Sequence, residues 1–347
     1  LFLMEASAPR KRVAVIGSGI AGLSAAYLTQ RVHDVTLFEK EPVVGMDAHS
    51  ISAHGARIDI PLRVFSRSYY PNLCSLYAHL GVKYGDADYS FCCVPAPDAR
   101  AYFRYTNLFV QGMAIPLPTM RLQLGSLFKY ARLAMQFLHF LNFAPGHIMR
   151  PELGQLCLSE FLCACGYSKE FAKELLLPML SVVCTCSFAA VEQYPAHLIV
   201  DYFANKYGFS GAQCRAHGGT RDIVGRLTAP LSQLQLGAGV HTVLAAGSHV
   251  VVRWRDAGGA EHHERFDEVV LATQANVSHK LLRTECSEQL AALGAFTYER
   301  KRTVLHTDAS LMPACPKDWS PLNIFLSPTE DAASVTVWMN RIDDQLA

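Results

Sequence analysis

The chain has 347 residues, half of them hydrophobic, which is enough to bury more than one core, so two domains are expected. Its 31 lysines and arginines nearly balance its 30 aspartates and glutamates, and the net charge of +1 gives no electrostatic basis for binding nucleic acid. Composition therefore favours small-molecule chemistry.

A dinucleotide-binding turn is predicted near the start. The apolar run Val13–Ile16 is typical of a buried parallel strand, and Gly17-x-Gly19-x-x-Gly22 then opens a helix. In this motif Gly17 permits the tight turn, Gly19 lets the backbone approach a pyrophosphate, and Gly22 lets the helix pack on the strand. The unpaired N–H groups of the helix N-terminus then face the phosphates.

A second strand, Asp34–Glu39, ends in an acid about 20 residues after the central glycine. A carboxylate at this position binds a ribose hydroxyl, so Glu39 predicts an unphosphorylated adenosine ribose; the alternative is a solvated strand end. The next segment, Lys40–Ser50, is predicted to be a loop rather than a third Rossmann strand. Pro61 confines the strand-like run Arg57–Phe65 to an edge or an irregular crossing.

Residues 70–80 have helical apolar spacing, which Gly81 ends, and two short strands are predicted at Tyr89–Val94 and Ala101–Tyr105. Residues 118–144, which include Leu122 and Leu124, form the longest apolar stretch. Charged and polar side chains interrupt it, which argues against a membrane-spanning helix; they are Lys129, Arg132 and His139. A core helix, or one that lies on a membrane surface near a lipophilic substrate, is expected instead.

Two further helices, Leu156–Cys165 and Lys169–Val183, complete a mostly helical insertion. Thr220 then predicts a helix N-cap, with the helix running through Leu227. The first domain resumes in a group of strands with a hairpin turn at Asp256–Gly259; the strands are Val240–Val243, Val250–Trp254 and Phe266–Thr273. Two later strands are predicted at Thr303–His306 and Val335–Met339.

The eleven cysteines include no Cys-x-x-Cys pair, and residues 1–5 contain no apolar run of signal-peptide length. A reducing, cytoplasmic compartment is expected, with membrane association as the alternative. Cys163-x-Cys165 and Cys184-x-Cys186 are predicted to be buried structural thiols, and no metal site is predicted.

Several of these features resemble the FAD-dependent amine oxidase and protoporphyrinogen oxidase-like superfamily. They are the strand, glycine turn and acid-ended strand, then Gly45, His49-Ser50, His217-Gly218-Gly219-Thr220 and Asp267–Thr273. A narrower group is similar at Tyr69-Tyr70 before Pro71, at Val304–Asp308 and at Val337–Arg341. It comprises the predicted NAD/FAD-binding oxidoreductases that are encoded beside, or fused to, cyclopropane-fatty-acid synthases.

The resemblance extends from Arg12 to the last residue and implies an α/β fold. It implies a discontinuous Rossmann-type FAD-binding domain, residues 11–66 and 213–286, and an inserted α+β substrate domain, residues 67–212 and 287–347. It also implies that the chain ends before the C-terminal strand and helix that close the flavin site. Met46 departs from the paired glycines that the superfamily has at this point.

By position, the resemblance implies a set of FAD contacts. The pyrophosphate would be held by Gly17, Ser18, Gly19, Ala21 and Gly22, with Ala272 and Thr273 nearby. Glu39 and Lys40 would bind the adenosine ribose, and Val243 would contact adenine through its backbone; for Val243 and Ala272 the alternative is ordinary strand packing. Gly45 and His49 belong to the cofactor loop, and the segment Asp59–Val64, with Leu62, Arg63 and Val64, would pass beside the isoalloxazine ring.

Three residues are candidates for the chemistry. Arg63 would stabilise negative charge on a reduced flavin or anchor a carboxylate; the alternative is a surface arginine that pairs with Asp59. His306, with Asp308 on the same predicted strand, would give acid–base help, against the alternative of a core histidine. Tyr70, with Tyr69, would line an apolar cavity; the alternative is that both are core aromatics.

Three functions remain open. The first is an FAD-dependent oxidoreductase that transfers hydride to or from flavin N5 on a lipophilic, unsaturated fatty-acyl substrate. The second is an amine or protoporphyrinogen-type oxidase of the same fold. The third is a truncated, cofactor-free binding or regulatory module. Peripheral membrane contact is an additional expectation, and no nucleic acid is expected as a partner.

Overall fold

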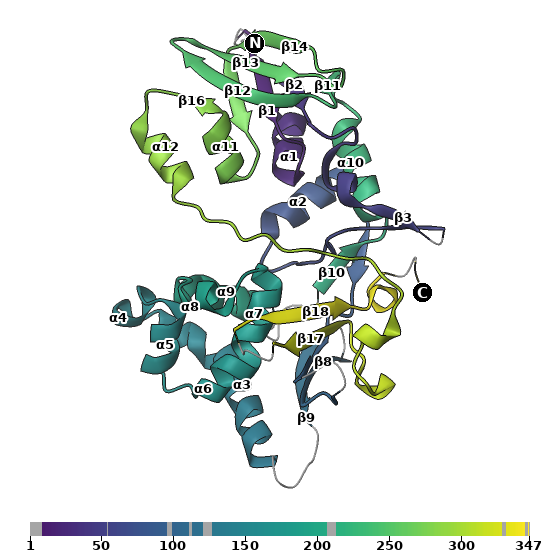
Figure 1. Cartoon of the computed structure of the whole chain (residues 1–347), viewed down its shortest axis with the longest axis vertical. Coiled ribbons are helices and arrows are strands. Elements are labelled where there is room, and N and C mark those ends of the chain that lie inside the picture. Colours follow the sequence, from purple (N-terminus) through teal and green to yellow (C-terminus); the bar gives the residue numbers. More distant parts are fainter. Residues whose placement is uncertain are drawn as a thin grey trace, which may run out of the picture. The chain divides into compact units, whose positions relative to one another are not determined.

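The computed structural model describes residues 9–53, 55–95, 99–110, 113–120, 127–206, 213–327, 331–343 and 346. The chain divides into two compact units (Figure 1). The first unit contains the chain up to Arg63 together with Ala78–Lys83 and Gly218–Tyr298. The second unit contains Val64–Tyr77, Tyr84–His217 and the chain from Glu299 onward.

The first unit is built on a four-stranded parallel sheet in the order β11-β2-β1-β15. Its strands are β1 (Arg12–Ile16), β2 (Asp34–Phe38), β11 (Gln233–Gln235) and β15 (Glu268–Leu271). The predicted strand Val13–Ile16 is confirmed, since all four residues are buried. Helix α1 (Ile20–Thr29) follows β1 at once and packs on the sheet through Leu23 and Ala26. A parallel neighbour requires such a crossover helix.

A second sheet of the same unit has the order β14-β13-β12-β16. Strands β12 (Gly239–Ala246), β13 (His249–Arg255) and β14 (Glu261–Phe266) are antiparallel, and β16 (Leu282–Arg283) runs parallel to β12. The predicted hairpin turn at Asp256–Gly259 is confirmed. Helices α10 (Gly219–Thr228), α11 (Ala275–Leu281) and α12 (Ser287–Gly294) complete the unit.

Among the described residues between β2 and Arg63, none forms a third Rossmann strand, as predicted. This segment forms a short 3-10 helix, η1 (Gly45–His49), and the two-stranded hairpin β3 (Ile51–Ala53) with β4 (Ala56–Ile58). The strand-like run at 57–65 is an irregular crossing, because β4 ends at Ile58 and β5 (Phe65–Ser66) begins only after Pro61. Proline has no N–H to donate to a strand ladder.

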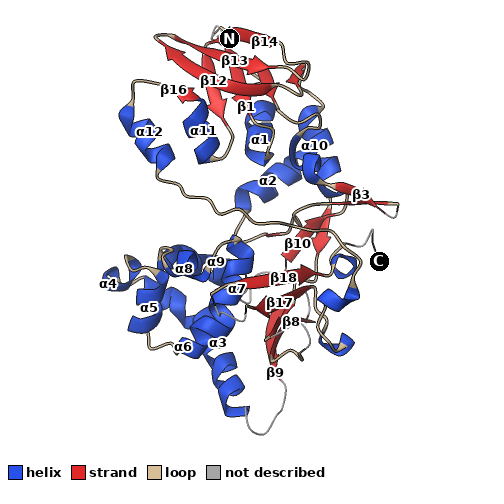
Figure 2. Cartoon of the chain, in the orientation of Figure 1, coloured by secondary structure: helices blue, strands red, loops and turns tan. Residues whose placement is uncertain are grey.

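The second unit combines two sheets with a group of helices (Figure 2). One sheet has the order β18-β17-β7-β8-β9 and the other the order β5-β10-β6. The strands are β6 (Tyr84–Asp86), β7 (Phe91–Val94), β8 (Phe103–Val110), β9 (Met113–Met120), β10 (Gln213–Ala216), β17 (Leu322–Leu326) and β18 (Ala333–Val337). The strands predicted from Tyr89, Ala101 and Val335 are therefore present, with shifted ends.

The helical part of this unit has one large apolar core. Its fully buried aromatic side chains are Phe137, Phe140, Phe161, Phe171 and Phe203. The helices are α3 (Leu127–Ile148), α4 (Pro151–Gly154), α5 (Leu158–Ala164), α6 (Lys169–Phe171), α7 (Leu177–Cys184), α8 (Phe188–Glu192) and α9 (Ala196–Lys206), with a π-helical turn at Ala172–Leu176. Helix α2 (Pro71–Leu80) precedes them and confirms the predicted helix.

The apolar stretch 118–144 is not one helix. Its first three residues belong to β9, and α3 begins at Leu127; Leu122 and Leu124 lie outside the described residues. Within the part of the chain that the structure describes, no helix combines the length and hydrophobicity that crossing a membrane requires.

Three sequence predictions are wrong in detail. Residues 303–306 form no strand, and Val304 is exposed there, so its β-branched side chain has no sheet face to pack on. Thr220 lies inside α10, and the N-cap of this helix is Gly218. The Thr220 hydroxyl does not cap the helix because it donates to the carboxylate of Asp59, which is 161 residues earlier in the sequence. Of the four thiols predicted to be buried, Cys186 is buried, Cys165 and Cys184 are half-buried, and Cys163 is exposed. Among the described residues, no group of three or more His, Cys, Asp and Glu could hold a metal.

Candidate dinucleotide site

The glycine turn between β1 and α1 is forced by sterics at two positions. Gly17 has φ +97°, and its N–H donates to the Phe38 carbonyl oxygen at 2.9 Å, which joins the ends of β1 and β2. A Cβ atom on Gly22 would lie 1.9 Å from the Gly17 carbonyl oxygen. No side chain fits at that distance, so Gly17 and Gly22 are required by the fold itself.

Gly19 has a different environment. A Cβ atom built on Gly19 would meet no atom within 4 Å, and its φ of −60° and ψ of 174° are accessible to any residue. Gly19 is the N-cap of α1, and no side chain caps the helix there. The first N–H groups of a helix have no intrahelical partner. This open, uncapped end fits an anionic diphosphate, which a side chain at Gly19 would obstruct.

The Glu39 carboxylate directly follows β2 and accepts three hydrogen bonds, two from Ser18 and one from Glu41. One of its oxygens accepts hydrogen bonds from the Ser18 N–H, at 3.0 Å, and from the Ser18 hydroxyl. The other accepts from the Glu41 N–H at 2.9 Å. The fully buried Ser18 hydroxyl in turn accepts from the Gly45 N–H at 2.7 Å. The turn, the strand end and the first residue of η1 are thereby fixed together.

The carboxyl end of β15 lies against the same turn. The Ala272 N–H donates to the Ile16 carbonyl oxygen at 2.9 Å, and the Ala272 side chain would be 3.1 Å from a Cβ on Gly22. The Thr273 methyl group would be 3.0 Å from a Cβ on Gly17. Both residues therefore lie at the turn, where the resemblance expects the pyrophosphate.

Val243 lies in the middle of β12 and is fully buried. It pairs with Val252 of β13 on one side and with Leu282 of β16 on the other. Because Val243 has a paired strand on each side, a contact from its backbone to adenine would have to lie on the β16 side, where Leu282 already pairs with it.

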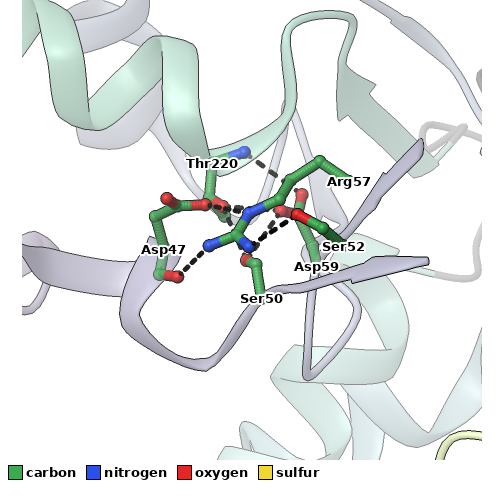
Figure 3. Close-up of polar contacts among 6 residues, drawn as sticks. All are labelled: Asp47, Ser50, Ser52, Arg57, Asp59 and Thr220. Atoms are coloured by element: carbon green, nitrogen blue, oxygen red, sulfur yellow. Dashed lines mark hydrogen bonds and ion pairs between the residues drawn. The ribbon is translucent and has the colours of Figure 1, made fainter. Parts of the chain in front are cut away.

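A buried polar network joins η1, the β3–β4 hairpin and the start of α10 (Figure 3). The Asp59 carboxylate, 2% exposed, accepts hydrogen bonds from the Thr220 N–H at 3.1 Å and the Thr220 hydroxyl at 2.6 Å. The Ser50 hydroxyl donates to the same carboxylate at 3.2 Å. A negative charge at a helix N-terminus is stabilising. Asp59 thus fixes the start of the segment Asp59–Val64 against α10.

Arg57 and Asp47 form the second half of this network. The Arg57 Nε donates to the Asp47 carboxylate at 2.9 Å, Nη2 donates to the Asp47 carbonyl oxygen at 2.8 Å, and Nη1 donates to the Ser52 hydroxyl at 3.1 Å (Figure 3). The Asp47 side chain is buried. The hairpin and η1 are therefore cross-linked by a charge-assisted pair, which is stronger than a neutral hydrogen bond.

The other predicted contacts are more open. Lys40 and His49 are exposed, and the Lys40 ammonium lies 3.5 Å from the Glu41 carboxylate. Gly45 has φ +70°, and Met46 follows it in η1, half-buried. Leu62 and Arg63 are half-buried in the irregular crossing that ends the first stretch of this unit, and Val64 begins the second unit. Ala21 lies in the first turn of α1.

The remaining chemical candidates belong to the second unit. Tyr70 is half-buried beside Tyr69, and the two ring centroids are 4.9 Å apart. Burial is the main cause that raises the pKa of the Tyr70 hydroxyl, and the neighbouring Tyr69 hydroxyl raises it further. His306 is exposed, so the alternative of a core histidine is wrong. Its Nδ1 accepts from the Asp308 N–H at 3.2 Å. Asp308 caps a short 3-10 helix by accepting from Ser310, which lowers its carboxyl pKa.

Sequence reasoning did not identify four members of the buried network: Asp47, Ser50, Arg57 and Thr220 as a hydrogen-bonding unit with Asp59. The Asp59–Thr220 bond joins residues 161 positions apart, and neither residue type predicts such a contact. The available signals were the acid Asp59 and, far away in the sequence, Thr220 after the pair Gly218-Gly219. A threonine after glycines also occurs at ordinary helix starts, so it does not point to a contact with Asp59.

Comparison with known proteins supports the fold. Residues 15–80 match the NAD(P)-binding Rossmann-like domain family. No curated protein matches the sequence. A double mutant of putrescine oxidase is similar in structure, with a TM-score of 0.57 and 18% identity over 82% of this chain and 64% of that one.

Two other solved structures are similar to the same degree. The CLA-producing fatty acid isomerase from P. acnes has a TM-score of 0.54 and 17% identity, over 82% of this chain and 63% of that one. An oxidoreductase from Methanosarcina mazei has a TM-score of 0.52 and 19% identity, over 82% and 65%. The chain spans less than two thirds of the length of each. It shares the mixed α/β fold with a Rossmann-like domain that these structures have.

Proposed function

We propose that the first unit binds FAD and that the chain is an FAD-dependent oxidoreductase. The observation that carries this proposal is the contrast within the glycine turn. Gly17 and Gly22 are required by packing, whereas Gly19 has open space where a side chain would be, at the uncapped start of α1. A glycine with no steric duty is explained by close approach of a phosphate.

Several groups would share the binding of the cofactor. The N-terminal N–H groups of α1 would take the diphosphate, with Ala272 and Thr273 beside it. Glu39, already oriented by Ser18 and Glu41, has acceptor capacity left on its carboxylate for the ribose hydroxyls. Asp59 would hold the start of the crossing that contains Leu62 and Arg63.

FAD, when bound, supplies hydride transfer at its N5 atom, and the protein supplies orientation and electrostatics. The Arg63 guanidinium would stabilise negative charge near the flavin or anchor a substrate carboxylate in two-pronged fashion. Tyr70 would give the substrate an apolar wall. His306 would act in proton transfer, although it lacks the strand that was expected to position it.

The proposed substrate is a lipophilic, unsaturated fatty-acyl chain. The resemblance to oxidoreductases associated with cyclopropane-fatty-acid synthases and the apolar helical part of the second unit support this choice. A fatty acid isomerase is among the structures with this fold. An amine substrate is the second candidate, because putrescine oxidase has the same fold. Sequence resemblance also leaves a porphyrinogen substrate and a cofactor-free module open.

Anaerobic mixing of the FAD-loaded chain with candidate substrates separates these proposals. Loss of flavin absorbance near its visible maximum with unsaturated acyl lipids, and not with diamines or a porphyrinogen, is the expected result. Bleaching by diamines alone would replace the lipid proposal with the amine proposal. A folded chain that takes up no FAD would leave the binding-module proposal.

A further inference from the structure

Helix α3 of the second unit exposes a row of large apolar side chains. Phe128 is 88% exposed, Met135 64% and Phe143 60%, and Met149, just after the helix, is 81% exposed. Spacings of 7 and 8 residues keep the first three side chains on one side of α3, and Met149 lies in the turn that follows the helix. The opposite side is buried in the core; its residues are Leu133, Ala134, Phe137, Phe140, Leu141 and Ala144.

A single exposed apolar residue needs no explanation, whereas several large ones aligned along one face of a helix indicate an interaction surface, here with the exposed polar residues Arg132 and Asn142 between them. Arg132 lies on the same exposed side, between Phe128 and Met135, and Arg150 follows Met149. His139 also lies there, and its ring stacks on Phe143 with centroids 5.0 Å apart. The patch therefore combines large apolar groups with cationic ones.

The surrounding sequence has an unusual charge pattern. Residues 99–151 contain no aspartate or glutamate but include six arginines and lysines: Arg100, Arg104, Arg121, Lys129, Arg132 and Arg150. The acids that approach α3 come from the following segment, which packs against it. The Glu174 carboxylate pairs with the Lys129 ammonium at 2.8 Å. The pKa of the Glu170 carboxyl is lowered mainly by a hydrogen bond from its own backbone N–H, and the nearby charges of Arg132 and Lys129 lower it further. The helix itself carries only positive charge.

We propose that this face of α3 docks on the surface of a bilayer that contains anionic lipids. The helix has 22 residues, about 33 Å in length, and would lie in the plane of the membrane. The phenylalanine and methionine side chains would enter the acyl boundary while Arg132 and Arg150 contact headgroup phosphates. This inference does not depend on the flavin proposal.

Flotation of the purified chain with vesicles tests the proposal. Vesicles of phosphatidylcholine alone are compared with vesicles containing 30% phosphatidylserine, at about 0.05 M and about 0.5 M salt. The chain should float with the anionic vesicles at low salt and much less at high salt. Phe128→Ser/Met135→Ser should lower the bound fraction about tenfold, because two large apolar groups no longer insert.

The matched control is Phe296→Ser/Val304→Ser, which removes two side chains of similar exposure that lie outside α3. It should bind vesicles as the unchanged chain does. Arg132→Gln, which removes the positive charge without placing a second carboxylate near Glu170, should reduce binding to the anionic vesicles while shifting the thermal unfolding curve little. Failure of the unchanged chain to float, or equal flotation of the α3 variants, would overturn the proposal. So would self-association that the α3 double variant abolishes, since the patch would then bind a second copy.

Discussion

The Glu39 carboxylate and Ser18 are 21 residues apart in sequence and are joined by two hydrogen bonds, one from the Ser18 N–H at 3.0 Å and one from its hydroxyl. The contact connects the end of β2 with the glycine turn after β1. It gives the carboxylate a fixed orientation before any ligand arrives, and such preorganisation lowers the cost of binding.

Glu39→Gln tests this orientation. The amide keeps one acceptor oxygen but replaces the other by an N–H₂ group, which donates and cannot accept. FAD affinity should fall about tenfold, and the free energy of unfolding should fall by about 1 kcal/mol. Glu41→Gln is the control, because Glu41 is partly exposed and lies 3.5 Å from Lys40 in a surface pair. Titration with FAD and urea unfolding measure both effects; equal behaviour of the two variants would contradict the assignment.

Gly22 and Gly225 are both helical glycines with opposite surroundings. Gly22→Ala places a methyl group 1.9 Å from the Gly17 carbonyl oxygen, so the free energy of unfolding should fall by about 3 kcal/mol. Gly225→Ala meets no atom within 4 Å in α10 and should raise it by about 0.5–1 kcal/mol. Thermal unfolding of both variants checks the signs. A Gly22→Ala chain as stable as the original would show that the turn differs from the one described.

The Asp59 network predicts a stability effect that local sequence does not. Asp59→Asn puts a donor opposite the Thr220 N–H or hydroxyl in a buried site, which should cost about 1–3 kcal/mol. The control is Asp222→Asn on α10, the helix that contains Thr220. It loses a partly exposed pair with Arg226 and should cost less than about 1 kcal/mol. Urea unfolding distinguishes them, and similar losses would argue against a special role for Asp59.

Asp318 in the second unit predicts a pH dependence. Burial pushes its carboxyl pKa upward, but hydrogen bonds from Arg100, at 2.6 and 3.2 Å, and from the Ala101 N–H outweigh burial and lower the pKa. Since the folded pKa lies below the unfolded value of about 4, the carboxylate stabilises the fold above about pH 4. That contribution is lost as the pH falls through the folded pKa.

Asp318→Asn should therefore cost about 1–3 kcal/mol at pH 7, and the difference from the unchanged chain should shrink below about pH 4. Urea unfolding at pH 7, 5 and 3.5 measures it. A difference that stays constant over this range would mean that the charge of Asp318 contributes nothing.

The sequence predicts the glycine turn well because its determinants are local. Four apolar residues, three glycines at set spacing and an acid at a strand end specify β1, α1 and β2 without reference to the rest of the chain. The buried network fails this condition. Asp59 and Thr220 meet only when α10 returns to the first unit after more than 150 residues.

At residues 303–306 the local sequence predicts a strand that the fold does not form. Thr303 and Val304 have high β propensity, but Val304 and Leu305 are 63% and 38% exposed, and residues 301–308 are described without any strand pairing. Strand formation depends on a partner and a face to bury, which propensity alone does not supply. Strand β14 was missed for the converse reason, because its charged residues pair with β13 on an exposed surface.

Gly19→Val tests most directly whether the glycine turn of the first unit binds FAD, because this substitution separates cofactor binding from folding. An added Cβ meets no atom within 4 Å and the backbone conformation is allowed for any residue, so the variant should unfold within a few degrees of the unchanged chain. After incubation with FAD and desalting, the unchanged chain should retain a visible flavin spectrum and the variant should be colourless. Retention of FAD by the variant, or its absence from the unchanged chain, would contradict the account.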